Sequence, residues 1–158
     1  MVGMVLRRAR TTRDEEAPNV NVTVGELMST EVMMVTRHET AGHAVDLMRR
    51  HHVSALPVVG PDGEPLGIIT ATDLLAERSE ATTVGNFMSS PAFTVPINEG
   101  PHVAARVMRN HHLHHVVVVD GHRVVGMVSA YDLLALVEDH RYQAKQAPTP
   151  SRKQSGRQ

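Results

Sequence analysis

Two short stretches of the sequence carry a hydroxyl residue with a glycine three positions before it and an aspartate three positions after it. They are Gly67-Ile68-Ile69-Thr70-Ala71-Thr72-Asp73 and Gly126-Met127-Val128-Ser129-Ala130-Tyr131-Asp132. A hydroxyl group and unpaired backbone N–H groups at the start of a helix can bind phosphate. A carboxylate one turn later can accept hydrogen bonds from both hydroxyls of a ribose. The same spacing also forms a capping box, and an isolated example is usually only a cap. The presence of two copies favours a paired binding site.

The histidines are the second group that could do chemistry. There are eleven, and the segment His111-His112-Leu113-His114-His115 resembles a metal-binding cluster. A metal site needs three or four converging ligands, usually with outer partners. The first two of these histidines, like His51 and His52, fall where a helix is predicted to end, and there the helix dipole favours a partly cationic ring. We therefore expect no metal site and keep a histidine-based metal sensor as the weaker alternative.

Residue patterns that would indicate catalysis are missing from the sequence. It contains no nucleophile paired with a base, no Walker loop and no glycine-rich dinucleotide turn. We therefore expect no enzyme activity, no catalytic residues and no catalytic cofactor.

Both aspartate motifs belong to an internal repeat, the most informative pattern in the chain. The segment 23–29 (TVGELMS) returns sixty positions later as 83–89 (TVGNFMS), and 48–52 returns at the same offset as 108–112. The offset then falls to 59, so that Asp73 aligns with Asp132. We expect one motif over residues 20–79 and a second over 80–142. The polar ends, 1–19 and 143–158, are expected to be disordered tails.

Each repeat is predicted to form a short helix, then strand, helix, strand, strand and helix. Apolar residues recur at helical spacing in 41–48 and 103–108, which indicates one buried face on each helix. Turn signals at 61–63 (PDG) and 120–121 (DG) predict hairpins. The strands are predicted at 32–36, 55–59, 66–70, 115–119 and 123–129. The pattern predicts an α/β (α+β) fold of two repeats, each with a small mixed sheet and helices on one face.

The composition narrows the class of protein. Lys plus Arg number 16 against 17 for Asp plus Glu, so no basic surface for nucleic acid or an anionic membrane is expected. There are no cysteines, and no apolar stretch approaches the roughly 20 residues that cross a bilayer. The first ten residues lack the apolar region of a signal peptide. We expect a cytoplasmic protein.

Three blocks in fixed order, each present twice, make the sequence similar to the CBS domain family. They are 23–28 (TVGELM), 52–59 (HVSALPVV) and the closing Gly-x-x-Thr/Ser-x-x-Asp, and the resemblance covers about 20–140. It implies a stand-alone tandem pair, a Bateman module, related by a pseudo-twofold axis with two clefts. In each cleft the middle block of one repeat would hold an adenine, and the closing motif of the other would meet ribose and phosphate.

Carried over to this sequence, the resemblance assigns residues to both clefts. One cleft would use Ser129 on phosphate and Asp132 on ribose, with the base held by Thr30, Met33, Val53, Ser54 and Ala55. The other would use Thr70 and Asp73, with the base held by Ser90, Phe93, Leu113, His114 and His115. Val117 stands where the first copy has Pro57, which puts the shape of the second cleft in question.

The family commonly places a basic residue before the second strand of a repeat, where it meets phosphate. In the repeat of Ser129 that position holds His114 and His115, whereas in the repeat of Thr70 it holds Ser54 and Ala55. The resemblance therefore predicts that the cleft with Ser129 binds phosphate better, and increasingly so as pH falls.

The implied function is a non-catalytic regulatory module that binds AMP, ADP or ATP as an energy or ligand sensor. The family commonly dimerises, and surplus apolar residues on the helices also predict a homodimer; these are Leu74, Leu75, Leu133, Leu134 and Leu136. An unlinked enzyme or transporter is a further expected partner. The alternatives are S-adenosylmethionine or NADH in the same clefts, or a protein-interaction module whose clefts stay empty.

Overall fold

The computed structural model describes residues 22–76 and 79–146, with side chains up to residue 138. The first repeat contains α1 (Val24–Leu27), β1 (Val35–Thr36), α2 (Ala41–His51), β2 (Ala55–Val59), β3 (Pro65–Thr70) and α3 (Ala71–Ala76). The second contains the 3-10 helix η1 (Val84–Asn86), β4 (Thr94–Pro96), α4 (Pro101–His111), β5 (His115–Asp120), β6 (Arg123–Ser129) and α5 (Ala130–Gln146). This order confirms the predicted fold.

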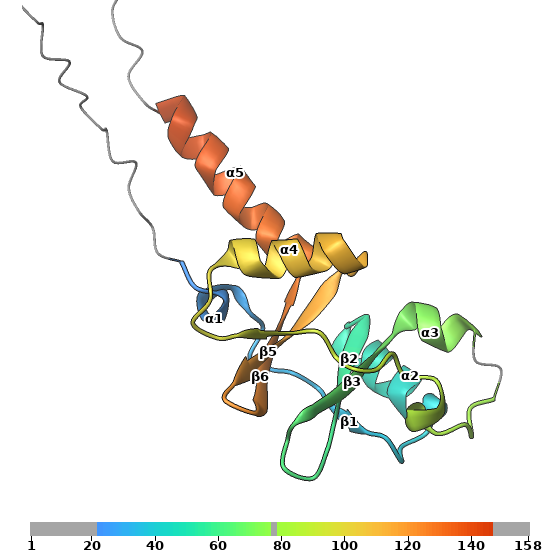
Figure 1. Cartoon of the computed structure of the whole chain (residues 1–158). Coiled ribbons are helices and arrows are strands. Elements are labelled where there is room, and N and C mark those ends of the chain that lie inside the picture. The colour runs from blue at the N-terminus through green and yellow to red at the C-terminus, as the bar shows by residue number, and fades with distance from the viewer. Residues whose placement is uncertain (1–21, 77–78, 147–158) are drawn as a thin grey trace, which may run out of the picture.

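Each repeat builds one three-stranded mixed sheet (Figure 1). The strand orders are β1-β2-β3 and β4-β5-β6; the first two strands of each sheet are parallel, and the last two are antiparallel. The first strand is shorter than the predicted 32–36, since only Val35 and Thr36 pair with β2. The predicted C-terminal tail starts later than expected, because residues 143–146 continue α5. Residues 1–19 and 147–158 lie outside the described part.

The two long central helices begin and end in equivalent ways. In α2 the Thr40 side chain caps the start by accepting a hydrogen bond from the His43 N–H at 3.2 Å, and α4 starts with Pro101. Both helices end at a histidine in the left-handed conformation, His52 and His112, each with a φ of 54°. The predicted helix ends are confirmed. Non-glycine residues adopt this backbone conformation infrequently, because the Cβ crowds the following carbonyl.

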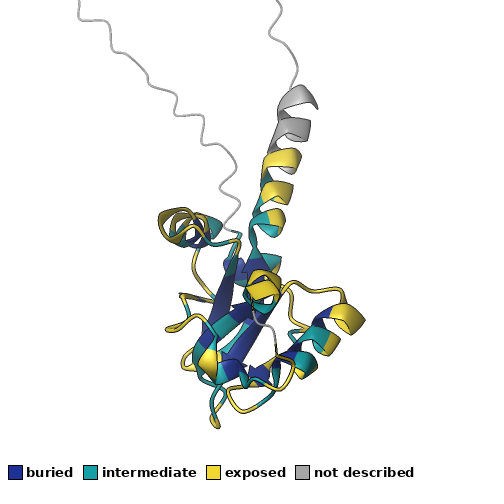
Figure 2. Ribbon diagram, turned by 90° about the vertical axis from the view of Figure 1, so that its right-hand side faces the viewer, coloured by how far each residue is buried: buried dark blue, intermediate teal, exposed yellow. Residues whose placement is uncertain are grey.

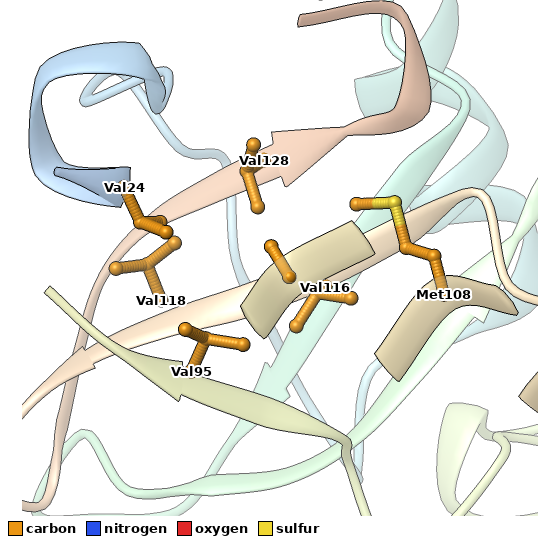
Figure 3. Close-up of a cluster of buried hydrophobic side chains, with 7 residues drawn as sticks. Val24, Val95, Met108, Val116, Val118 and Val128 are labelled. Atoms are coloured by element: carbon orange, nitrogen blue, oxygen red, sulfur yellow. The ribbon is translucent and has the colours of Figure 1, made fainter. Parts of the chain in front are cut away.

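The short opening helix of each repeat packs on the sheet of the other repeat. Val24 of α1 is fully buried in the second sheet's core, together with Val95, Ala104, Met108, Val116, Val118 and Val128 (Figure 3). Val84 of η1 is fully buried in the first core, beside Val35, Leu56, Val58 and Ile69. Backbone hydrogen bonds link the same elements: Val24 N–H donates to the Glu99 carbonyl at 2.7 Å, and Val84 N–H donates to the Glu39 carbonyl at 2.8 Å. Each core therefore contains residues from both repeats.

The segment that follows each opening helix crosses the last strand of the other repeat, at the glycine of its closing motif. Ser89 and Ile68 exchange two backbone hydrogen bonds of 2.9 Å, and Ser29 and Met127 form the equivalent pair. A Cβ on Gly67 would lie 2.6 Å from the Ser89 carbonyl oxygen, closer than real Cβ atoms approach. The motif glycine is thus required by the crossing of two chain segments.

The last helix extends well beyond the sheets. It begins at the end of β6 and projects away from the rest of the molecule, with much of its surface exposed (Figures 1 and 2). Over the described residues, no helix is both long enough and apolar enough to span a membrane.

Candidate functional site

The closing motifs form the capping boxes that their spacing predicts. The Asp132 Oδ2 accepts hydrogen bonds from the Ser129 N–H and Oγ, both at 2.7 Å, and the Asp132 N–H donates back to that Oγ at 3.2 Å. Thr70 and Asp73 repeat the arrangement, at 2.8, 2.9 and 3.4 Å. Each carboxylate thus serves as a cap through Oδ2, and its Oδ1 has no hydrogen bond among the described residues.

The backbone at these helix starts differs from the expectation. The Ala71 N–H donates to the Ser54 carbonyl at 2.9 Å, and the Ala130 N–H donates to the His114 carbonyl at 2.8 Å. The N–H groups of Thr70 and Ser129 are bonded to their aspartates. The prediction of unpaired N–H groups for phosphate is therefore wrong for these positions, because a carbonyl of the same repeat and the cap already satisfy them.

The first cleft, here called the Ser129 cleft, has a volume of about 210 Å³. It brings together the predicted Met33, Val53, Ser54, Ala55, Ser129 and Asp132, whereas the predicted Thr30 is not among the residues that line it. His115, which the resemblance predicted to meet phosphate in this cleft, also lines it. The lining residues that were not predicted are Ser29, Glu31, Val32, His52 and Met127. Most of these are neighbours in sequence of predicted residues, which is the one signal that could have identified them.

The second cleft, here called the Thr70 cleft, has a volume of about 620 Å³. It brings together all seven residues assigned to it: Thr70, Asp73, Ser90, Phe93, Leu113, His114 and His115. The remaining lining residues are Ser54, Ile68, Ala71, Thr72, Ser89, Pro91 and His112. The Ser90 hydroxyl donates to the Leu66 carbonyl at 3.0 Å, so it is already engaged within the protein.

An aromatic side chain stands in the wall of the Thr70 cleft. The ring of Phe93 stacks on that of His111, with centroids 3.9 Å apart and planes inclined by 30°. Phe93 remains 39% exposed, so part of its surface is available to a ligand. His111 ends α4 and also supports this ring, a role that its sequence position alone did not indicate.

Ser54 and His115 lie between the two clefts and line both of them. The Ser54 Oγ and the His115 Nε2 are 3.3 Å apart. Burial lowers the pKa of His115 below its usual 6.5, the neighbouring His114 lowers it further, and Asp132 opposes both effects. At neutral pH the His115 ring is therefore uncharged.

The distribution of histidines corrects one expectation from the sequence. His112, His114 and His115 line the Thr70 cleft, whereas His52 and His115 line the Ser129 cleft. Of the two histidines predicted to meet phosphate in the Ser129 cleft, His115 lines that cleft, whereas the His114 side chain lines the Thr70 cleft instead. In each cleft the closing motif of one repeat faces the middle block of the other. The backbone of His114 adjoins the Ser129 motif, since its carbonyl accepts the Ala130 N–H, but its side chain lines the cleft of Thr70. Neither described lining contains Lys or Arg.

Within residues 22–76 and 79–138, no three or more His, Asp or Glu side chains converge as metal ligands.

Comparisons with known proteins identify similar sequences and structures. The family model described as "CBS domain" matches residues 24–80 and 84–139. Hypoxic response protein 1 of Mycobacterium tuberculosis is 29% identical over 124 residues, which are 75% of this chain and 87% of that protein. Its crystal structure with two coordinated zinc ions matches at 30% identity with a TM-score of 0.65, over 72% of this chain and 98% of that one.

Two further solved structures contain adenosine compounds. The CBS domain pair of protein MJ0100, in complex with 5′-methylthioadenosine and S-adenosyl-L-methionine, is 27% identical with a TM-score of 0.66, over 75% of this chain and 98% of that one. The cytosolic domain of the Mg²⁺ channel MgtE, in complex with ATP, is 25% identical with a TM-score of 0.66, over 72% of this chain and 48% of that one.

Proposed function

The chain belongs to the CBS domain family as a tandem pair, and from this we propose that it is a non-catalytic sensor of an adenosine nucleotide. The observation that carries the proposal is the Thr70 cleft. In that cleft a capped aspartate with one uncommitted oxygen, an exposed aromatic ring and three histidines line one space of about 620 Å³. That volume lies within the roughly 300–1,000 Å³ of typical ligand sites.

The proposed roles follow from the positions of the side chains. The Asp73 Oδ1 accepts hydrogen bonds from the ribose hydroxyls, while Oδ2 keeps its bonds to Thr70. Phe93 packs against the base, and its contact with His111 fixes the ring. The imidazoles of His112, His114 and His115 meet the phosphate. Asp132, Met33 and Val53 supply the equivalent ribose and base contacts in the Ser129 cleft.

A protein that binds a ligand without catalysing a reaction transmits a signal only if two of its conformational states bind that ligand with different affinities. We propose that the signal is passed across a homodimer, with an unlinked enzyme or transporter as the regulated partner. Several large apolar side chains of the helices are exposed in the single chain and would supply the contact surface: Leu75, Tyr131, Leu134 and Val137.

A thermal-shift series tests the nucleotide proposal. We expect AMP, ADP or ATP to raise the unfolding temperature, and GMP at the same concentration to have a smaller effect. S-adenosylmethionine and NADH belong in the series, because the ribose and adenine contacts would be shared. A protein whose unfolding temperature no adenosine compound changes would contradict the proposal and leave an interaction module with empty clefts.

Metal binding is the second candidate, favoured by the zinc ions described for the hypoxic response protein. Elemental analysis of the purified chain tests it directly. Stoichiometric zinc that survives dialysis would support this candidate, although no cluster of three ligands converges among the described residues.

A further inference from the structure

The two clefts differ in the charges that line them. Two carboxylates, Glu31 and Asp132, line the Ser129 cleft together with two histidines, His52 and His115. One carboxylate, Asp73, lines the Thr70 cleft together with three histidines. The Thr70 cleft is thus more positive than the Ser129 cleft whether the imidazoles are neutral or protonated.

Glu31 is the residue that separates the two clefts most clearly. The repeat offset of sixty places Pro91 at the equivalent position of the second repeat. Pro91 lines the Thr70 cleft as Glu31 lines the Ser129 cleft. Pseudo-symmetric positions therefore present a carboxylate to one ligand and an uncharged ring to the other.

This difference matters most for a phosphate group, which carries about two negative charges near neutral pH. The backbone N–H groups of Thr70, Ala71, Ser129 and Ala130 are already bonded within the protein. These four groups therefore do not compensate the phosphate charge, and the full charges that act on it are those of the lining side chains. A second carboxylate opposes phosphate binding through like-charge repulsion.

The volumes of the clefts also favour the Thr70 cleft as the nucleotide site. The Ser129 cleft, at about 210 Å³, is about a third as large as the Thr70 cleft, at about 620 Å³. The smaller volume lies below the usual range for ligand sites, and the larger lies within it. A phosphate adds volume as well as charge, so both properties favour the Thr70 cleft for a nucleotide.

We propose that the clefts take different adenosyl ligands. The Thr70 cleft binds a phosphate-bearing nucleotide, and the Ser129 cleft selects an adenosyl compound without phosphate, with Glu31 as the residue that rejects phosphate. The inference rests on the proposed function, since both clefts must first bind adenosine compounds.

Isothermal titration of the full chain with AMP and with adenosine tests the assignment, because these probes differ only by the phosphate. Asp132→Asn weakens the Ser129 cleft and isolates the Thr70 cleft, and Asp73→Asn does the reverse. We expect the Asp132→Asn variant to bind AMP about tenfold more tightly than adenosine. The Asp73→Asn variant is expected to bind adenosine at least as tightly as AMP.

A second substitution tests the role of Glu31 itself. In the Asp73→Asn chain, Glu31→Gln should raise the affinity for AMP by about two- to fivefold and leave that for adenosine unchanged, since Glu31 is exposed and its charge is screened. Glu138→Gln removes an exposed carboxylate on α5, outside both clefts, and should change neither affinity. Glu31→Gln in the otherwise unchanged chain gives the same comparison if an aspartate variant unfolds.

The outcomes separate this inference from the proposed function. The same preference for AMP over adenosine in both aspartate variants, or no effect of Glu31→Gln on AMP, would overturn the inference and leave the nucleotide site intact. A wild-type chain that binds neither probe would overturn the proposed function and this inference with it.

Discussion

At the scale of single residues, one carboxylate in each cleft has two tasks. The Oδ2 atoms of Asp73 and Asp132 accept the backbone and hydroxyl hydrogen bonds that start α3 and α5. The capping interpretation and the ribose-binding hypothesis are therefore compatible, because they use different oxygens of the same side chain. An asparagine can still accept the capping bonds through its single carbonyl oxygen, which removes only the second, charged acceptor.

Asparagine substitution is predicted to separate the two tasks. We expect Asp132→Asn and Asp73→Asn each to weaken the affinity of their own cleft for its adenosine compound by about 1.5–3 kcal/mol, the loss of a charged hydrogen bond. The fold should survive, since a helix cap contributes only about 1 kcal/mol. Calorimetric titration measures the affinity, and urea unfolding measures the stability. Unchanged affinity in both single variants and in the double variant would remove the ribose role of these aspartates.

A pH dependence is expected from His115, which both clefts share. Burial and His114 lower the pKa of the His115 ring, Asp132 partly offsets them, and Ser54 is its hydrogen-bond neighbour. A bound phosphate would raise this pKa by favouring the cation. The contact is then present at low pH and lost as pH rises through the raised value. Protonation of the nucleotide's own phosphate near ~6 opposes the trend at the acid end, which leaves an optimum.

Calorimetry near pH 6 and near pH 8 measures this dependence on the wild type and on His115→Ala. We expect tighter AMP binding at the lower pH in the wild type and a clearly smaller difference in the variant. A pH difference of equal size in both proteins would show that His115 has no part in phosphate binding.

At the scale of elements, both histidine-ended helices depend on a left-handed residue. His52 and His112 each adopt a φ of 54° after a helix of eleven residues. Glycine adopts this conformation without the steric cost borne by other residues. Both histidines also line a cleft, His52 the Ser129 cleft and His112 the Thr70 cleft. Strained backbone positions often occur at binding sites, where the side chain has a use that offsets the strain.

Replacing one of these histidines by glycine is therefore predicted to stabilise the fold. We expect His112→Gly to raise the free energy of unfolding by about 0.5–1 kcal/mol, because relief of the left-handed strain exceeds the added entropy of the unfolded chain. Arg109→Gly, inside the same helix, is the matched control and should lower it by about 1 kcal/mol. Urea denaturation measures both. Destabilisation by His112→Gly as large as that by Arg109→Gly would contradict the strain argument.

The glycine of each closing motif gives a second prediction at this scale. Gly67→Ala would place a Cβ 2.6 Å from the backbone carbonyl oxygen of Ser89, so the crossing segment must shift. We expect a loss of about 1–3 kcal/mol in the free energy of unfolding. Gly126→Ala should cost less, because its nearest obstacle is the flexible side chain of Met28 and the Ser29 carbonyl lies at 3.0 Å. Chemical denaturation measures the free energy of unfolding of both variants. A Gly67→Ala variant as stable as the wild type would refute the close crossing.

At the scale of the whole molecule, the exchange of opening helices makes the two repeats one cooperative unit. Each core loses a fully buried valine, Val24 or Val84, if the repeats are separated. The clefts are shared in the same way, since each combines the middle block of one repeat with the closing motif of the other. A structural change at one cleft therefore involves segments of both repeats.

The exposed apolar side chains predict self-association through the last helix. Tyr131, Leu134 and Val137 follow one another at spacings of three on α5 and are 84%, 60% and 55% exposed. We expect light scattering to show a dimer at roughly tens of micromolar protein, driven by burial of this apolar stripe. The double variant Leu134→Glu with Val137→Glu should be monomeric, whereas Ala135→Glu, elsewhere on the exposed helix surface, should remain dimeric. A monomeric wild type, with and without nucleotide, would refute the prediction.

The sequence by itself determined the elements, the repeat and about half of the residues that line the clefts. Helical periodicity, turn residues and caps are local properties, so they fixed the order of helices and strands and the helix ends at His52 and His112. The family resemblance assigned seven residues to the Thr70 cleft, and all seven line one space in the structure.

Only the tertiary structure decided how the repeats share their parts. The burial of Val24 in the second core and the position of Glu31 in the Ser129 cleft both depend on contacts between segments far apart in sequence. The His114 side chain lines the Thr70 cleft for the same reason, although it belongs to the repeat of Ser129. The local sequence signals of each repeat would be the same whether its opening helix packed on its own sheet or on the sheet of the other repeat. The choice between arrangements is made by packing across the pseudo-twofold axis, which local sequence patterns do not encode.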